Sequence, residues 1–136
     1  MEFRSKFAIV VAEDLASWQK LNVVAFLTSG VLSEDENSVG EEYRDASGVS
    51  YLPLCIQPIV VLKANREKLP TFLNRANSRG LRAAVYIQDM FETGHDAANR
   101  ATVARYATNE LPLVGLGLSA DKRDVDKVFK GAKLHD

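Results

Sequence analysis

Two short apolar runs constrain the fold of this chain more than any other feature, and each ends in acidic or amide side chains. Residues 7–12 (FAIVVA) are followed by Glu13 and Asp14, and residues 83–87 (AAVYI) are followed by Gln88 and Asp89. Runs of this length predict strands buried on both faces of a parallel sheet. Because ligands bind outside the carboxyl ends of such strands, both runs predict the same crevice. The two runs predict where a functional site lies more securely than which reaction takes place there.

The other apolar positions predict an alternation of strands and helices. The run at 83–87 lies in an expected strand over 82–88, and two further strands are expected near 59–62 and over 113–118. Helices are expected over 15–29, about 68–79, about 97–108 and about 121–129. Gly30 is the expected C-cap of the first helix, and Asp96 is the expected N-cap of the third.

A strand, a helix and a strand over residues 59–88 favour a right-handed parallel crossover. We therefore predict an α/β fold, with one domain over residues 1–136. Its expected architecture is a three-layer α/β/α sandwich around a mixed, mostly parallel sheet of about four core strands.

Residues 33–52 differ in composition from the rest of the chain. Six acidic residues and Arg44 lie in this stretch, with Gly40 and Gly48 and little apolar periodicity. This composition predicts an exposed acidic excursion, pinched into a hairpin around residues 45–48.

Bulk composition restricts the classes of function. The net charge of −1 and the pI of about 6.1 do not provide the basic field typical of proteins dedicated to nucleic acid. Cys55 is the only cysteine, so neither an intramolecular disulfide nor a cysteine-based metal site is expected. With no N-terminal apolar segment of signal-peptide or membrane length, we expect a soluble cytoplasmic protein that does not contact membranes.

A basic bias marks the second predicted helix and its flanks. Three interpretations are open: contact with phosphates, contact with the acidic excursion of a second copy in a homodimer, or a solvated helix face. The basic residues are Lys63, Arg66, Lys68, Arg75, Arg79 and Arg82.

Four segments resemble the type II peptidyl-tRNA hydrolase family. Residues 10–15 (VVAEDL) followed by Lys20 are similar to its first strand and first helix start, and Asp89 and Thr93 keep the interval of its third-strand motif. Residues 116–118 (LGL) match its last strand. The most specific match is residues 125–134 (VDKVFKGAKL), which resemble its terminal helix. The chain is also similar to a bacterial group known only as domain of unknown function number 2000, which brings no activity with it.

Several positions depart from the hydrolase pattern. The family's paired lysines are reduced to Lys20, while Phe91 and Gly94 replace a glycine and a glutamine beside the Asp-Thr motif. The excursion at 33–52 and the helix at 97–108 have no family counterpart.

Lys20, Asp89 and Thr93 are the candidate catalytic residues. The carboxylate would position or deprotonate a water, the ammonium would stabilise an oxyanion, and the hydroxyl would orient the substrate carbonyl. The resemblance implies hydrolysis of an ester or amide, such as the bond in peptidyl-tRNA. The structural alternative is that Asp89 caps a loop, Lys20 lies on a solvated face and Thr93 makes a local turn hydrogen bond.

Three residues are candidates for ligand binding: Asp14 at a strand end, Trp18 as a stacking surface and Gly117 as a point of close approach. For Trp18 the alternative is packing. No cofactor and no metal are expected, and His95 is interpreted as a surface loop residue. The alternative to a hydrolase is a non-catalytic module that binds a small metabolite or a protein partner in the same crevice. The expected partners are thus a small molecule, tRNA or a second copy of the chain, and an oligomeric scaffold is a third possibility.

Overall fold

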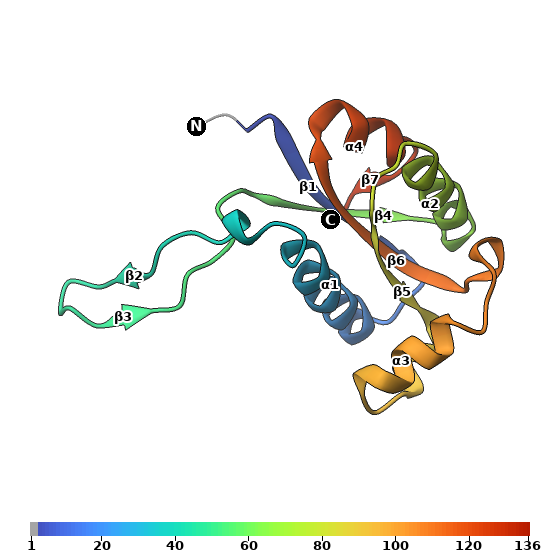
Figure 1. Cartoon of the computed structure of the whole chain (residues 1–136), viewed down its shortest axis with the longest axis horizontal. Coiled ribbons are helices and arrows are strands. Elements are labelled where there is room, and N and C mark those ends of the chain that lie inside the picture. Colours follow the sequence, from blue (N-terminus) through green and yellow to red (C-terminus); the bar gives the residue numbers. More distant parts are fainter. Residues whose placement is uncertain (1–2) are drawn as a thin grey trace.

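A five-stranded mixed sheet forms the centre of the protein (Figure 1). The structure is a computed structural model that describes residues 3–136. The strands, in order across the sheet, are β5 (Ala84–Ile87), β6 (Leu113–Asp121), β1 (Ser5–Ala12), β4 (Ile59–Ala64) and β7 (Lys133–Leu134).

The directions of the strands correct one expectation. β1 pairs parallel with β4, while β6 pairs antiparallel with both β1 and β5, and β7 pairs antiparallel with β4. β1, β4 and β5 therefore run in the same direction. The prediction of a mostly parallel sheet is nevertheless wrong, because three of the four strand pairings of this sheet in residues 3–136 are antiparallel. β7 has only two residues, which is too short to give an alternating pattern in the sequence.

Residues 3–136 contain four α-helices and four short 3-10 turns, and one of the turns, η1, lies away from the sheet in the segment between α1 and β4. α1 packs on β6, β1 and β5, whereas α2 and α4 pack on each other and on β6. The helices are α1 (Ser17–Leu32), α2 (Leu69–Ser78), α3 (Asp96–Val103) and α4 (Lys122–Val128). The 3-10 turns are η1 (Glu36–Ser38), η2 (Arg66–Lys68), η3 (Gln88–Glu92) and η4 (Thr108–Glu110).

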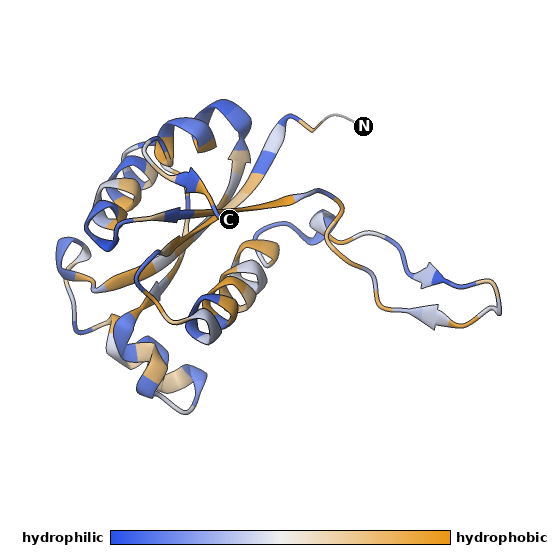
Figure 2. Ribbon diagram, turned by 180° about the vertical axis from the view of Figure 1, so that it is seen from behind, coloured by the Kyte–Doolittle hydropathy of each residue, from blue (hydrophilic) through white to orange (hydrophobic). Residues whose placement is uncertain are grey.

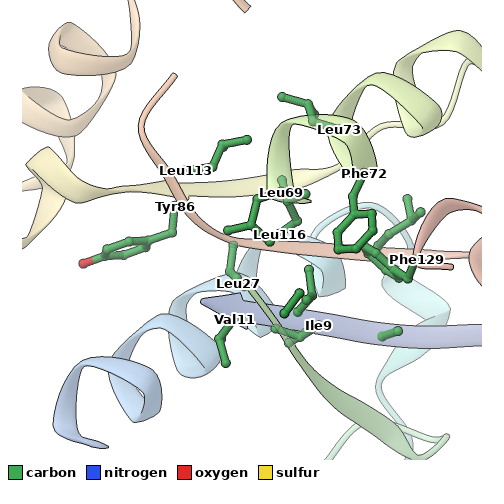
Figure 3. Packing of buried hydrophobic residues seen from close by; sticks show 14 of the residues in the cluster. Ile9, Val11, Leu27, Leu69, Phe72, Leu73, Tyr86, Leu113, Leu116 and Phe129 are labelled. Carbon is green, nitrogen blue, oxygen red and sulfur yellow. The ribbon is translucent and has the colours of Figure 1, made fainter. Parts of the chain in front are cut away.

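The hydrophobic core lies between the sheet and these helices. In α2 the apolar residues Leu69, Phe72, Leu73 and Ala76 are buried, as their helical spacing predicts. Figure 3 shows Phe72 directed at Phe129, and their ring centroids lie 5.8 Å apart at an interplanar angle of 88°. This edge-to-face pair joins α2 to the end of α4.

Two glycines in β6 allow α1 to lie close to the sheet. A Cβ atom on Gly115 would lie 2.6 Å from Cγ1 of Val23, and one on Gly117 would lie 2.9 Å from Cγ2 of Val31. The close approach that these glycines signal in the sequence is therefore made by a helix. Gly117 lies beneath α1, where it serves helix packing.

Helix and strand ends agree with the sequence at several positions and differ at two. β4 begins at Ile59 as expected. Gly30 is not a C-cap, because α1 continues to Leu32. Asp96 is not the N-cap of α3; His95 fills that position, and its Nδ1 accepts a hydrogen bond from the Ala98 amide. None of the helices within residues 3–136 has the length and apolarity needed to span a membrane.

Residues 33–58 project from the body between α1 and β4 and are called the arm below (Figure 1). Near its tip, β2 (Tyr43–Arg44) pairs antiparallel with β3 (Ser50–Tyr51). This confirms the hairpin around residues 45–48, where Gly48 has a φ of 86°. Figure 2 shows hydrophobic residues in the sheet and also along the arm.

Candidate functional site

The carboxyl ends of β1, β4 and β5 are joined by one side chain, Arg66 of η2. Its Nη2 lies 3.2 Å from Oδ1 of Asp14, and its Nη1 donates to Oε1 of Gln88 at 2.8 Å. Asp14 follows β1 and Gln88 follows β5, so the two strand ends singled out in the sequence meet at one guanidinium. The sequence pattern assigns Arg66 only to the basic stripe. Like Asp14 and Gln88, however, Arg66 is a polar residue that closely follows a predicted strand.

Asp89 is bound by a residue from the segment after α3. Its Oδ2 accepts a hydrogen bond from the Tyr106 hydroxyl at 2.9 Å. This hydrogen bond is the main reason that the pKa of Tyr106 is raised above its ordinary value, with desolvation and the Asp89 charge adding to it. Asp89 therefore anchors the chain that leaves α3.

Thr93 anchors the same helix from its other end. The Thr93 hydroxyl donates to the Met90 carbonyl at 3.0 Å and is hydrogen-bonded to the side chain of Asn99 in α3. The first of these contacts is a local turn hydrogen bond. Asp89 and Thr93 thus hold α3 against η3, and both Asn99 and Tyr106 were missed because their sequence positions carry no distinctive motif.

Lys20 lies elsewhere, in a groove of about 370 Å³. Leu21 and Val24 of α1 form one wall of this groove, and Val61 of β4 and His135 form the other. Within residues 3–136 no salt bridge joins Lys20 to Asp89. The structure therefore brings Asp89 and Thr93 to α3, whereas Lys20 faces the groove above β4.

Trp18 connects α1 to η3. Its ring meets Phe91 at an interplanar angle of 70°, with centroids 5.9 Å apart, and 58% of the residue remains exposed. Phe91 also lies 5.3 Å from Tyr86, which in turn lies 5.9 Å from Phe26. These four rings form a continuous aromatic row that runs from α1 across η3 and β5 and back to α1.

A second groove, of about 580 Å³, opens beside this row and is called the α3 groove below. It lies between α1, β5 and α3, and burial raises the pKa of Tyr86 on its wall. Most of its lining is apolar, with Asn99 and the Asp96–Arg100 ion pair as the main polar groups. The lining residues are Phe26, Leu27, Ser29, Gly30, Ala84, Val85, Tyr86, Met90, Asp96, Asn99, Arg100, Val103 and Ala104. Such a groove can bind an apolar body and hydrogen-bond one polar end.

The basic residues of the predicted stripe have partners in their own chain. Lys63 binds Asp136 at 2.6 Å, and Arg82 lies 3.8 Å from Glu34. Arg75 donates to the carbonyl oxygens of residues 128 and 130 at the end of α4. These contacts favour a structural role for the stripe. Among residues 3–136 no group of three or more His, Cys, Asp or Glu side chains is arranged to hold a metal ion.

Comparisons with known proteins add a family and a close structure. Residues 5–136 match the family described as "Protein of unknown function (DUF2000)". A solved structure of a protein of unknown function from Agrobacterium tumefaciens is 46% identical, with a TM-score of 0.97 over 99% of this chain and 100% of that one. No curated protein matches the chain significantly.

Proposed function

The chain belongs to the DUF2000 family, and we propose that it is a binding module that takes a small, largely apolar ligand into the α3 groove. The observation that carries this proposal is the groove itself, whose apolar lining comes from four separate elements, α1, β5, η3 and α3. Ligand sites are typically concave and mostly apolar, with a few polar groups that fix orientation.

The contacts of the candidate catalytic residues favour binding over catalysis. Asp89 accepts from Tyr106, and Thr93 is hydrogen-bonded to Met90 and Asn99. Both side chains thereby position α3, which forms one wall of the groove. Lys20 lines a different groove, whose lining includes neither Asp89 nor Thr93.

The lining also indicates the class of ligand. Tyr86, Phe26 and Met90 offer flat and adaptable apolar surface, which suits an aromatic or aliphatic body. Asp96 and Arg100 neutralise each other, so the groove has no net charge to attract a highly charged ligand. Asn99 can hydrogen-bond a single polar end.

The test is a titration with the fluorescent probe anilinonaphthalene sulfonate. Ala104 lines the groove on the exposed side of α3, so Ala104→Phe fills the groove without disturbing the core. Ala101 is an exposed α3 residue outside the lining, and Ala101→Phe is the matched control. We expect saturable binding that Ala104→Phe weakens at least tenfold and Ala101→Phe leaves unchanged. Equal binding by both variants would remove the proposal.

A second candidate is hydrolysis of an ester or amide, such as peptidyl-tRNA, at the carboxyl edge of the sheet. It is favoured by the Arg66 contacts, which bring the ends of β1, β4 and β5 together beside Asp89. In this proposal Asp89 positions water, Lys20 approaches the oxyanion as substrate binds, and Thr93 orients the carbonyl. Asp14 and Trp18 would contact the substrate.

Asp89→Asn separates the two candidates. The amide oxygen can still accept from Tyr106, so α3 stays anchored, but the carboxylate needed for catalysis is lost. If the protein is a hydrolase, release of peptide from diacetyl-lysyl-tRNA falls at least a hundredfold in this variant. Wild-type release no faster than that of the variant would exclude the hydrolase, while unchanged probe binding would support the binding module.

The resemblance to type II peptidyl-tRNA hydrolases also supports a finer description of the fold. We infer a single domain with a three-layer α/β/α arrangement, similar to that superfamily. The basis is the match of residues 125–134 to its terminal helix and the mixed sheet with helices packed on it.

A further inference from the structure

The arm exposes apolar side chains that the body of the protein does not cover. Every residue from 39 to 52 is exposed, and Leu52 retains 84% of its accessible surface. Seven large apolar residues of the arm are exposed, at roughly 100 Å² each for side chains of this size. They are Val39, Tyr43, Val49, Tyr51, Leu52, Leu54 and Ile56. Exposed apolar surface of several hundred square ångströms marks an interaction site.

The tip of the arm is nevertheless tightly constrained by its own hydrogen bonds. Asp45 accepts from the amides of Ser47 and Val49 and from the Tyr51 hydroxyl at 2.7 Å. Arg44 donates to the Gly48 carbonyl at 3.2 Å. A hairpin of this size has little stability alone. The hydrogen bonds therefore matter, because they preorganise the tip and lower the conformational entropy lost on docking.

The outer surface of α1 is the matching feature on the body. Trp18, Leu21 and Phe26 are 58%, 73% and 58% exposed, and Lys20 is the only charged residue among the sixteen of this helix. A helix that is apolar on all sides is normally buried on all sides. Beside Leu21 lies the groove of about 370 Å³ that contains Lys20 and Val61, which is open above β4.

The charges of the two surfaces are complementary, because Asp136, the acidic residue that lines the Lys20 groove, is paired with Lys63. The arm carries six acidic residues and one arginine, whereas α1 has no acidic residue and a single lysine. An acidic, apolar arm therefore matches an apolar helix with one cation.

We propose that the arm of one molecule docks on α1 and the Lys20 groove of a second copy of this chain. The arm leaves the carboxyl end of α1 and extends away from its own helix (Figure 1), so it is placed to reach another molecule. Each chain carries one arm and one receiving surface, and a twofold pair with reciprocal exchange covers all four. Two arms together approach the roughly 1,600 Å² buried in a standard stable interface. The receiving surface shares Phe26 with the α3 groove, but Leu21 and Leu52 lie outside the lining of that groove, so substitutions there test docking separately from ligand binding.

Sedimentation velocity over roughly 1–100 μM tests the association. We expect the wild-type protein to sediment as a dimer, and Leu52→Asp in the arm or Leu21→Asp in α1 to weaken association at least tenfold. Leu134→Asp is the matched control, because Leu134 is 70% exposed and pairs with Leu62, which faces α4 rather than α1. Circular dichroism checks that each variant is folded.

A mixing experiment then identifies which surfaces meet. The Leu21→Asp protein has an intact arm and the Leu52→Asp protein has an intact α1 surface, so an equimolar mixture should regain one of the two contacts and form heterodimers. A monomeric wild-type protein would overturn the proposal. It would do so even if the arm were found to bind a different protein. Dimers that survive both substitutions, or a mixture that stays monomeric, would overturn it as well.

Discussion

Replacement of Gly115 by alanine tests whether the contact between α1 and the sheet is as close as the structure indicates. The new Cβ would lie 2.6 Å from Cγ1 of Val23, 3.0 Å from Cδ1 of Leu27 and 3.2 Å from the carbonyl oxygen of Val10. Ordinary contacts between carbon atoms are about 3.5–4.0 Å, so α1 would have to move outward by roughly 1 Å. The central strand β1 cannot move, because it pairs on both sides.

The expected cost follows from this overpacking. Inserting one methyl into a filled core typically lowers the free energy of unfolding by about 1–3 kcal/mol, and the backbone oxygen on one side places Gly115→Ala near the upper end. For a chain of this size, about 2–3 kcal/mol corresponds to a fall of roughly 6–12 °C in Tm.

Gly94→Ala is the control, because no atom lies within 4 Å of a Cβ at Gly94 and its φ is not positive. There the alanine should be neutral or stabilise by up to about 1 kcal/mol, since it restricts the unfolded chain. Both variants and the wild-type protein are unfolded in urea at one fixed protein concentration, because association would make the midpoint depend on concentration. A Gly115→Ala protein within about 0.5 kcal/mol of wild type would refute the close packing of α1 on β6.

Two further predictions concern the arm and the core. The pKa of Asp45 lies below its ordinary value of 3.8, chiefly because of the Tyr51 hydrogen bond. The ionised carboxylate holds the tip, so the hydrogen-bonded order of the tip should be complete above pH 3.8. This order should be lost as the pH falls through the lowered pKa. Amide NMR shifts of Ser47 that titrate at or above 3.8 would contradict this. Phe72→Ala should lower the free energy of unfolding by about 3–5 kcal/mol, because Phe72 is buried. The exposed neighbour Thr71→Ala should change it by less than about 0.5 kcal/mol, and similar urea midpoints for the two would argue against the assigned core.

Local patterns in the sequence were sufficient to predict most elements of the fold. The start of β4 after Pro58, the buried face of α2 and the hairpin near Gly48 each depend on residues close together in the chain. The order of strands does not. The insertion of β6 between β5 and β1 depends on pairing between segments more than a hundred residues apart, such as Ser5 with Asp121. No local pattern encodes that neighbour relation.

The same distinction applies to the candidate site. The rule for strand ends correctly brought Asp14 and Gln88 to one edge, because it depends only on strand direction. It could not give the partners of Asp89, since the Tyr106 hydroxyl reaches back from beyond α3. Side-chain partners such as these decide whether a carboxylate is available for chemistry, and they follow only from the folded chain.

The position of β6 also has a consequence for biosynthesis. During translation β1, β4 and β5 leave the ribosome before β6, yet β5 and β1 are both paired to it in the finished sheet. A nascent chain that stops at residue 112 can pair β1 with β4, but it has no strand that joins β5 to them. Until residues 113–121 have left the ribosome, the edge of β1 that pairs with β6 stays open, and a chaperone that shields this edge during elongation would prevent aggregation of the waiting strands.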